Sequence, residues 1–485
     1  MSTDRFTDRP TDRAAGLPRL ERSTGRRFRR INAVVLTGLA VAAVGLGAAN
    51  ATQGPRLSST EINTRAVVAR AEQRLVLTAN QPLAAVEPSQ VRVSPSTRVD
   101  DVSVDGPTLT IRFADILGYD TDYTVTVADV SGAFTTAVGT LTHGFSTPSV
   151  DVFTLLRDDG EPGGQDAPDR IFRNSPTGAE SEEVFQAPRI QEYVVSESVL
   201  VAATRGEDGA ESLVLTSLGD GVSATVPTPV GGPLYDLGLS EQLLGFRLGG
   251  EVDPRTSTRV APLFVLDLTD PSGVPVQVLG LDGAPLGVRD YDFVPGSTAL
   301  VAQADDDQLY LLDPIAGTPP TPLGQHAELR GFVPGTTDLV VADPSSESVI
   351  DLADGSVAPL DLPPADADPA TIPGRLVVLG EDRYVQQFDR VDYALARTTI
   401  SSELLLVDPS GTERIYRPTS ETSRIRDFCV SPNGQLLAIE VVPLDGVLDD
   451  DDLLPAFSDM TTYFVDVSSG ATTRSVSGFL PSWCH

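Results

Sequence analysis

Short apolar strands and tight turns alternate along the C-terminal two thirds of the chain. The clearest copy, at 426–440, is a strand, a turn at 432–434 and a second, apolar strand. Weaker copies of this strand–turn–strand pattern are centred on Pro295 and Pro334. Such self-similarity indicates a repeat architecture in which each repeat is one supersecondary unit.

The turns mark the period of the repeat. They lie at Ser196, Ser240, Pro295, Pro334, Gly380 and Pro432. Their mean spacing is about 47 residues, close to the length of a four-stranded propeller blade. The spacing predicts an all-β fold with a seven-bladed β-propeller over 150–485. We expect the strand at 478–485 to close the ring by joining the strands that follow residue 150.

A hairpin signal follows most of these turns, because an apolar strand ends in Asp and a Gly comes three or four residues later. The Asp positions are Asp313, Asp351, Asp408 and Asp466. Together with the VSPNG run at 430–434, these hairpins resemble the blades of TolB-like and WD-repeat-like β-propellers. The resemblance implies the propeller fold and adds no catalytic residue.

Alternating apolar and polar positions predict a small β-sandwich over 73–149. This stretch resembles the bacterial Ig-like domains of surface-layer and other envelope proteins. The resemblance rests on the LGYDTDYTV run at 117–125 and the closing FSTP run at 145–148. It implies a spacer or adhesion module without chemistry of its own. Residues 50–72 are polar and lack periodicity, so we expect them to form a linker.

The N-terminus has the features of a membrane anchor. Residues 1–30 carry nine arginines and four acids, which predicts a disordered, Arg-rich cytoplasmic tail. No charged residue occurs from Ile31 to Ala49, a length that just spans a hydrocarbon core of roughly 30 Å. Arginines before the span place the following domains outside the cytoplasm. The alternative is a secretory signal cleaved near Ala51, because Ala49-Asn50-Ala51 fits a small-x-small site.

The composition excludes nucleic acid as a partner. The net charge is −33 and every basic residue is arginine, so the phosphate backbone would be repelled. The simplest interpretation of so many acids is solubility.

The two cysteines are expected to pair. Cys429 lies in the first strand of the last predicted blade and Cys484 in the strand that closes the ring. A location outside the cytoplasm permits a disulfide, which would staple the ring at its seam. The alternative is two separate buried thiols.

Candidate chemistry is sparse. The three histidines are too scattered for a zinc site, and no nucleophile elbow or nucleotide loop occurs. Acid-rich loops can hold calcium, and the best candidate has four ligands, Asp158, Asp159, Asp166 and Asp169. The simpler interpretation of this loop, and of the acidic runs at 305–307 and 449–452, is a solvated turn. We expect no other cofactor and no catalytic residue.

Two functions stay open. The first is a single-pass cell-membrane protein whose extracytoplasmic propeller binds an envelope protein or a glycan. The second is an envelope hydrolase or lyase that uses acidic residues in the propeller channel. Two carboxylates facing each other across a cleft would favour the second.

Overall fold

The structure is a computed structural model of the chain. It describes residues 24–484 except 52, 158–166, 207, 230–231, 241, 253–258, 271–272, 345, 381, 393–397, 421–422, 444, 450 and 452. The side chains at 24–27, 43–51, 251–252, 259, 392 and 398–400 also lie outside the description. The predicted tail at 1–23 is therefore not covered.

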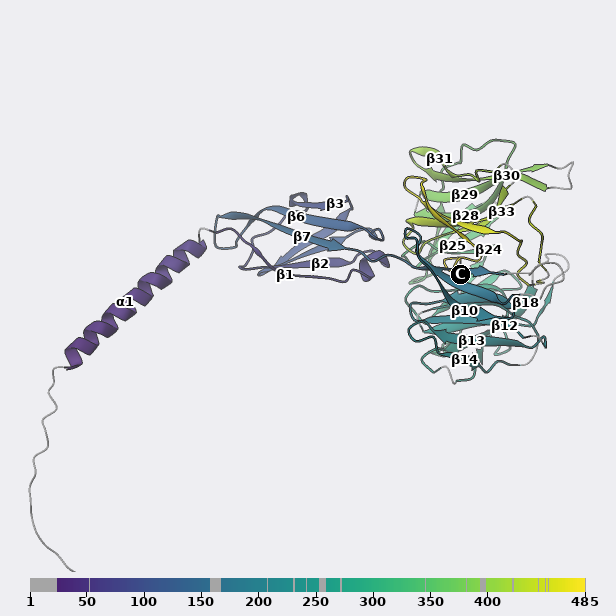
Figure 1. Ribbon diagram of the computed structural model, residues 1–485, viewed down its shortest axis with the longest axis horizontal. Coiled ribbons are helices and arrows are strands. Elements are labelled where there is room, and N and C mark those ends of the chain that lie inside the picture. Colours follow the sequence, from purple (N-terminus) through teal and green to yellow (C-terminus); the bar gives the residue numbers. More distant parts are fainter. Residues whose placement is uncertain are drawn as a thin grey trace, which may run out of the picture.

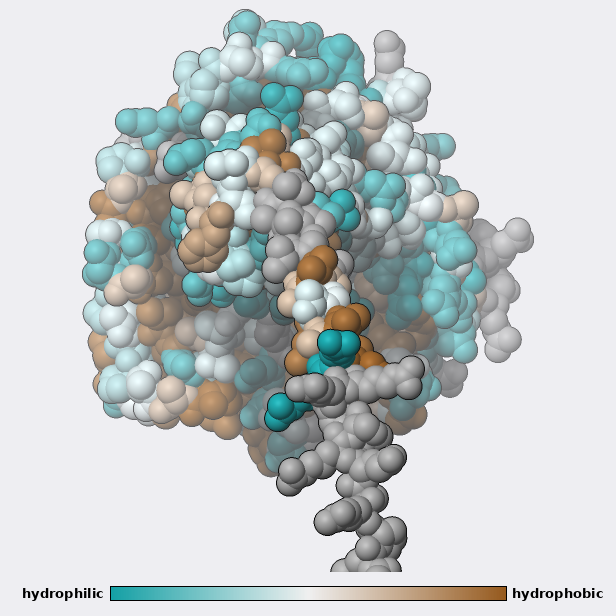
Figure 2. Space-filling model, turned by 90° about the vertical axis from the view of Figure 1, so that its left-hand side faces the viewer, coloured by the Kyte–Doolittle hydropathy of each residue, from teal (hydrophilic) through white to brown (hydrophobic). Residues whose placement is uncertain are grey.

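One continuous helix, α1 (Thr24–Ala51), projects away from the rest of the chain (Figure 1). It begins before the uncharged stretch, so residues 24–30 are helical and the predicted disordered tail is wrong there. Large apolar side chains from Ile31 to Val41 are exposed along it (Figure 2). Within the side chains that the structure describes, no helix is both long and apolar enough to cross a membrane. The last part of the expected span, 43–49, and Ala51 lie outside those side chains.

The predicted linker at 50–72 is wrong, because most of it is built into the first domain. Strand β1 (Leu57–Ile62) pairs antiparallel with β2 (Arg74–Ala79). The short helix η1 (Ala66–Val68) between them buries Val67 and Val68 in the core. The apolar positions are too few and too unevenly spaced to reveal a strand in the sequence.

The first domain is a β-sandwich, as predicted. One sheet has the order β1-β2-β5-β4 and the other β3-β6-β7. The remaining elements are η2 (Pro88–Gln90), β3 (Val91–Ser94), β4 (Val99–Asp105), β5 (Thr108–Phe113), β6 (Asp122–Ser131) and β7 (Val138–Ser146). Alternate residues of both sheets meet in one core that includes Leu77, Ile111 and Val125. This core explains the period-two pattern of the sequence.

After the sandwich the chain folds into consecutive antiparallel sheets (Figure 1). The first has three strands: β8 (Val152–Leu156), β9 (Asp169–Asn174) and β10 (Ser181–Ala187). The second has four: β11 (Ile190–Val195), β12 (Val199–Arg205), β13 (Glu211–Ser217) and β14 (Ser223–Val226).

A nine-stranded sheet follows, because β18 and β20 pair over two residues. Its strands are β15 (Leu234–Leu239), β16 (Leu243–Leu248), β17 (Glu251–Val252), β18 (Arg259–Asp267), β19 (Val276–Gln277), β20 (Gly287–Phe293), β21 (Leu300–Ala304), β22 (Gln308–Leu312) and β23 (Thr321–Gln325).

Three further sheets of four strands complete the domain. They contain β24 (Glu328–Phe332), β25 (Asp338–Asp343), β26 (Ser346–Asp351) and β27 (Val357–Leu360); β28 (Ile372–Gly380), β29 (Arg383–Asp392), β30 (Thr398–Asp408) and β31 (Gly411–Tyr416); and β32 (Ser423–Val430), β33 (Leu436–Pro443), β34 (Thr461–Asp466) and β35 (Thr472–Ser477). First strands of successive sheets contact one another, as β11 does β15 and β28 does β32. This arrangement is a β-propeller.

The turns that marked the period all join a first strand to a second strand, which confirms the repeat. Gly296, Gly335 and Gly434 occupy equivalent turn positions with φ of 69°, 74° and 74°. Glycine adopts this left-handed conformation without steric cost, so it recurs in these turns.

The sandwich is docked on these turns through hydrogen bonds. The backbone N–H of Tyr119 donates to Gln435 Oε1 (2.6 Å). The side-chain amide of Asn433 donates to the carbonyl of Leu117 (3.2 Å). The repeat turn between β32 and β33 is therefore also an interdomain contact.

Two further turns pack against the sandwich. A Cβ at Gly335 would collide with Ile116, and a Cβ at Gly296 would lie 3.2 Å from Nη2 of Arg70. The sandwich thus bears on turns from three different sheets, at one end of the propeller strands.

Candidate functional site

Only one of the four predicted calcium ligands can be located. Three lie outside the described residues: Asp158, Asp159 and Asp166. Asp169 is buried in β9, where it accepts a hydrogen bond from the N–H of Ile190 (2.7 Å) and faces Arg157. Over the described stretches, no group of three or more His, Cys, Asp or Glu is arranged to hold a metal ion. The calcium site stays a prediction.

Cys429 and Cys484 form a disulfide with Cα atoms 5.1 Å apart. This is the pairing expected from their places in the repeat. The bond packs beside Phe464 and Trp483, whose rings meet edge to face with centroids 5.9 Å apart. It joins β32 to the segment that follows β35.

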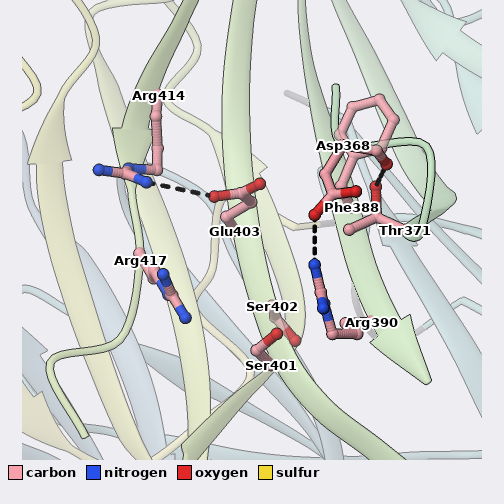
Figure 3. Close-up of a pocket in the computed structure, with 9 residues that line it drawn as sticks. All are labelled: Asp368, Thr371, Phe388, Arg390, Ser401, Ser402, Glu403, Arg414 and Arg417. Atoms are coloured by element: carbon pink, nitrogen blue, oxygen red, sulfur yellow. Dashed lines mark hydrogen bonds and ion pairs between the residues drawn. The ribbon is translucent and has the colours of Figure 1, made fainter. Parts of the chain in front are cut away.

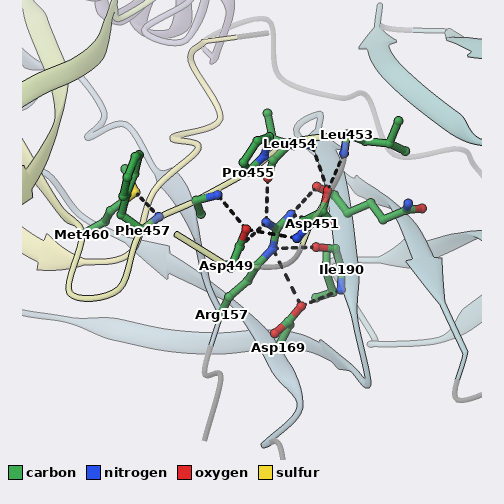
Figure 4. Close-up of polar contacts among 12 residues, drawn as sticks. Arg157, Asp169, Ile190, Asp449, Asp451, Leu453, Leu454, Pro455, Phe457 and Met460 are labelled. Atoms are coloured by element: carbon green, nitrogen blue, oxygen red, sulfur yellow. Dashed lines mark hydrogen bonds and ion pairs between the residues drawn. The ribbon is translucent and has the colours of Figure 1, made fainter. Parts of the chain in front are cut away.

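Arg157, just after β8, is the centre of a buried charged cluster (Figure 4). Its side chain is 3 % exposed and its guanidinium makes four hydrogen bonds. One goes to Asp449 Oδ2 (2.8 Å), and the others go to the carbonyls of Ile190, Gln191 and Leu454. Four of its five donors are therefore used within the protein.

Two further carboxylates face the same guanidinium. Asp451 Oδ2 lies 3.6 Å from Nη2, and Asp169 Oδ2 lies 4.0 Å from Nε. The expectation of a solvated turn at 449–452 is wrong for both described acids, because Asp449 and Asp451 are almost fully buried. We refer to Arg157, Asp169, Asp449 and Asp451 as the Arg157 cluster.

The acids of the Arg157 cluster also fold their own loop. Asp449 Oδ1 accepts from the N–H of Ala456 (3.0 Å), and Asp451 Oδ1 accepts from the N–H groups of Leu453 and Leu454. Such local bonds are typical of Asp in turns. The loop after β33 is therefore ordered by its acids and fixed to β8 by the arginine.

A second group of charges lies on the first strands of the sheets. In each of β11, β15, β20, β24, β28 and β32, the register with the second strand is irregular near a charged residue. Bulges of this kind re-aim side chains. Three neighbouring first strands contribute acids, Glu192, Asp236, Asp290 and Asp292, which we call the first-strand acids.

Desolvation is the main cause of unusual titration among the first-strand acids. It raises the pKa of Glu192 to about 8, with help from the negative charge of Asp236. It also raises the pKa of Asp292 to about 7 and that of Asp290 to about 6. Arg247 opposes the shifts of Glu192 and Asp290 and forms an ion pair with Asp236 (2.6 Å). Perturbed carboxyls of this kind are candidates for proton transfer or ligand binding.

A local sequence signal accompanies some of these acids. An acid directly precedes an aromatic residue in Glu192-Tyr193, Asp290-Tyr291 and Asp427-Phe428. In the structure the aromatic ring is buried and the acid is half-buried. The dipeptide marks the first strands β11, β20 and β32 and misses Asp236, which precedes Leu237 in β15.

A polar cavity of about 540 Å³ lies in the β28–β31 sheet (Figure 3). Its charged and aromatic lining comprises Asp368, Phe388, Arg390, Glu403, Arg414 and Arg417, and its hydroxyls come from Thr371, Ser401 and Ser402. These residues lie at the start of β28 and β30 and at the end of β29 and β31. The sandwich bears on turns between first and second strands, so this cavity is at the opposite end of the strands.

Comparisons with known proteins give a fold likeness alone. No protein-family model and no curated protein matches the chain. A putative 6-phosphogluconolactonase from Bacteroides uniformis matches 68 % of this chain and 98 % of its own, with 13 % identity and a TM-score of 0.42. TolB from Acinetobacter baumannii covers 81 % and 83 %, with 9 % identity and a TM-score of 0.37. Apo AztD from Citrobacter koseri covers 69 % and 84 %, with 14 % identity and a TM-score of 0.37. Likeness at this level carries no argument about activity.

Proposed function

We propose that this chain is a non-catalytic binding protein outside the cytoplasm. An Ig-like domain would hold a seven-bladed β-propeller whose free face engages a glycan or a protein of the cell envelope. The observation that carries the proposal is the position of the sandwich. It bears on the turns at one end of the propeller strands, whereas the arginine-lined cavity lies at the opposite end. A partner then meets the face that is turned away from the N-terminal domain.

The seven-bladed ring is supported by how the two ends of the propeller meet. Leu155 in β8 and Phe479 exchange both backbone hydrogen bonds, each 2.9 Å. The C-terminal segment would therefore act as the missing first strand of the three-stranded sheet. Counting β15–β19 and β20–β23 as separate blades gives seven.

The closing segment has side-chain support as well. Its Leu480 donates its N–H to Glu440 Oε1 (2.6 Å) and accepts a hydrogen bond from the Tyr193 hydroxyl (2.6 Å). These partners belong to β33 and β11, which lie on either side of the proposed closing blade.

The location outside the cytoplasm rests on one observation of the structure. A disulfide joins Cys429 and Cys484, and such bonds persist in oxidising compartments. The attachment to a membrane rests on the sequence, which has no charge from Ile31 to Ala49 after an arginine-rich start. A topology reporter fused at either end of the chain tests this part by itself.

The binding function is tested by crosslinking in cells. A photoreactive residue at Thr419, which is exposed just beyond the cavity, should capture a specific partner. The same residue at Phe134, which is 88 % exposed in the sandwich, is the matched control and should capture none. Equal capture at both positions would contradict the proposal.

One observation favours the second candidate, an envelope hydrolase or lyase. The raised pKa of Glu192, about 8, leaves this carboxyl protonated at neutral pH and able to donate a proton. The test is turnover of envelope polysaccharides by the purified chain, with Glu192→Gln as the variant. Turnover that the substitution abolishes would replace the binding proposal with this one.

A further inference from the structure

Three arginines and two acids line the β28–β31 cavity, so one positive charge is left without a counter-charge. Arg390 pairs with Asp368, and Arg414 Nη1 lies 3.7 Å from Glu403 Oε2. Arg417 has neither an ion pair nor a hydrogen bond within the described part of the chain. Arg417 is exposed, so its guanidinium is free to meet an anionic group that enters the cavity.

The floor of the cavity holds an unsatisfied hydroxyl. Ser402 is 1 % exposed, and its Oγ has no hydrogen-bond partner. Buried polar atoms in native proteins are nearly always paired, so each exception requires an explanation. Figure 3 shows Ser401 and Ser402 between Arg417 on one side and Arg390 on the other. The unused hydroxyl and the unused guanidinium thus belong to the same cavity.

The rest of the lining defines what could occupy this space. The carboxylates of Asp368 and Glu403 accept hydrogen bonds, and Thr371 can donate and accept them. Phe388 supplies an aromatic side chain, while none of the lining residues that the structure describes is aliphatic. The volume of about 540 Å³ falls in the usual range of small-ligand sites.

From these features we propose that the β28–β31 cavity binds an acidic sugar, a hexuronate unit of a glycan. Arg417 would receive the single carboxylate, for which guanidinium geometry is well suited. Ser402 and the two acceptor carboxylates would receive the sugar hydroxyls, and Phe388 would face a C–H surface of the ring. A peptide carboxylate fits less well, because the described lining offers no aliphatic subsite for side chains. This assignment rests on the proposed binding function and names its ligand class.

Calorimetric titration of the purified full-length chain tests the assignment, with D-glucuronate and a short oligogalacturonate as ligands. Both should bind, and neutral D-glucose should give no measurable heat at the same concentration. Arg417→Ala should weaken binding about tenfold to a hundredfold, the usual effect of losing a hydrogen bond to a charged group. Arg92→Ala removes an exposed arginine of the sandwich and should leave the affinity unchanged.

Ser402→Ala separates binding from folding. It should weaken uronate binding severalfold while the Tm stays the same or rises, because the removed hydroxyl has no partner in the folded protein. Equal affinity for D-glucuronate in wild type and Arg417→Ala overturns the proposal. So does tighter binding of inorganic phosphate or of a tripeptide with a free carboxyl terminus.

The outcome is distinguishable from that of the binding proposal. Specific capture at Thr419 in cells without uronate binding would reject the sugar and keep the binding function. The opposite result is uronate binding that Arg417→Ala abolishes, together with equal capture at Thr419 and Phe134. It would support the sugar site and reject a partner that binds the propeller face turned away from the sandwich.

Discussion

Two arginine sites at the same end of the propeller strands use their charge in opposite ways. Arg157 is buried, makes four hydrogen bonds and faces three carboxylates. Arg417 is exposed and, among the described residues, has no partner in a cavity with an unsatisfied hydroxyl. A saturated arginine holds elements together, whereas an unsaturated arginine can bind something outside the chain. The two sites therefore differ in how many hydrogen-bond partners the protein gives the arginine, and not in the charge of the arginine itself.

The largest expected effect is at Arg157. Arg157→Met keeps much of the side-chain volume but leaves three buried carboxylates without their cation. Breaking a buried pair in this way costs about 3 to 5 kcal/mol. Chemical denaturation should show this loss. A free energy of unfolding within error of wild type would show that the Arg157 cluster is not structural.

The disulfide should have the next largest effect, because it fixes the C-terminal segment to β32. Replacing Cys429 and Cys484 together with alanine should lower the free energy of unfolding by about 2 to 4 kcal/mol. Reducing agent should lower the Tm of the wild type and leave the Tm of the double variant unchanged. If reductant left the Tm of the wild type unchanged, the disulfide would not contribute to stability.

The first-strand acids are intermediate between these two sites, because they lie close together and Arg247 neutralises only part of their charge. The pKa of Glu192 is raised from 4.5 to about 8, so the folded protein binds this proton more tightly than the unfolded chain does. The contribution of this carboxyl to stability is then largest below about pH 4.5 and is lost as the pH rises to about 8. In Glu192→Gln the Tm should decline less over that range. Glu413→Gln, on the exposed face of β31, is the control and should keep the wild-type slope.

The smallest effect is expected from Arg417→Met, the same substitution as Arg157→Met at the second arginine. Arg417→Met should leave the Tm unchanged, because no hydrogen bond or ion pair within the described chain depends on this side chain. The pair Arg157→Met and Arg417→Met then measures the difference between a saturated and an unsaturated arginine directly. Similar losses of stability in both variants would show that Arg417 is as important to the fold as Arg157.

The sequence predicts the repeat well because the signal is local. The turns at Pro295, Pro334 and Pro432 need a glycine with positive φ, and the strands around them need apolar residues to bury. The pairing of Cys429 with Cys484 followed from counting these copies. In contrast, β1 was missed because its burial pattern is weak and its stability comes from pairing with β2.

The charged sites could not be predicted in the same way, because their members are far apart in the sequence. Arg157 meets Asp449 across 292 positions, and no local pattern marks either residue as buried. The acids at 449–452 looked like a solvated run, since only the fold reveals that an arginine lies opposite them. The cavity is harder still, because the missing partners of Arg417 and Ser402 can be recognised only after all other partners are known.

The docking of the sandwich on repeat turns has a mechanical consequence. Tension applied through the N-terminal domain reaches the propeller at the turns near Gly296, Gly335 and Asn433, which belong to different sheets. The load is shared across several sheets instead of peeling β8 away from β9. The C-terminal segment beside β8 resists the same load, since Leu155 is held from both sides by β9 and Phe479. Force on the N-terminal domain would therefore be spread over several sheets of the propeller.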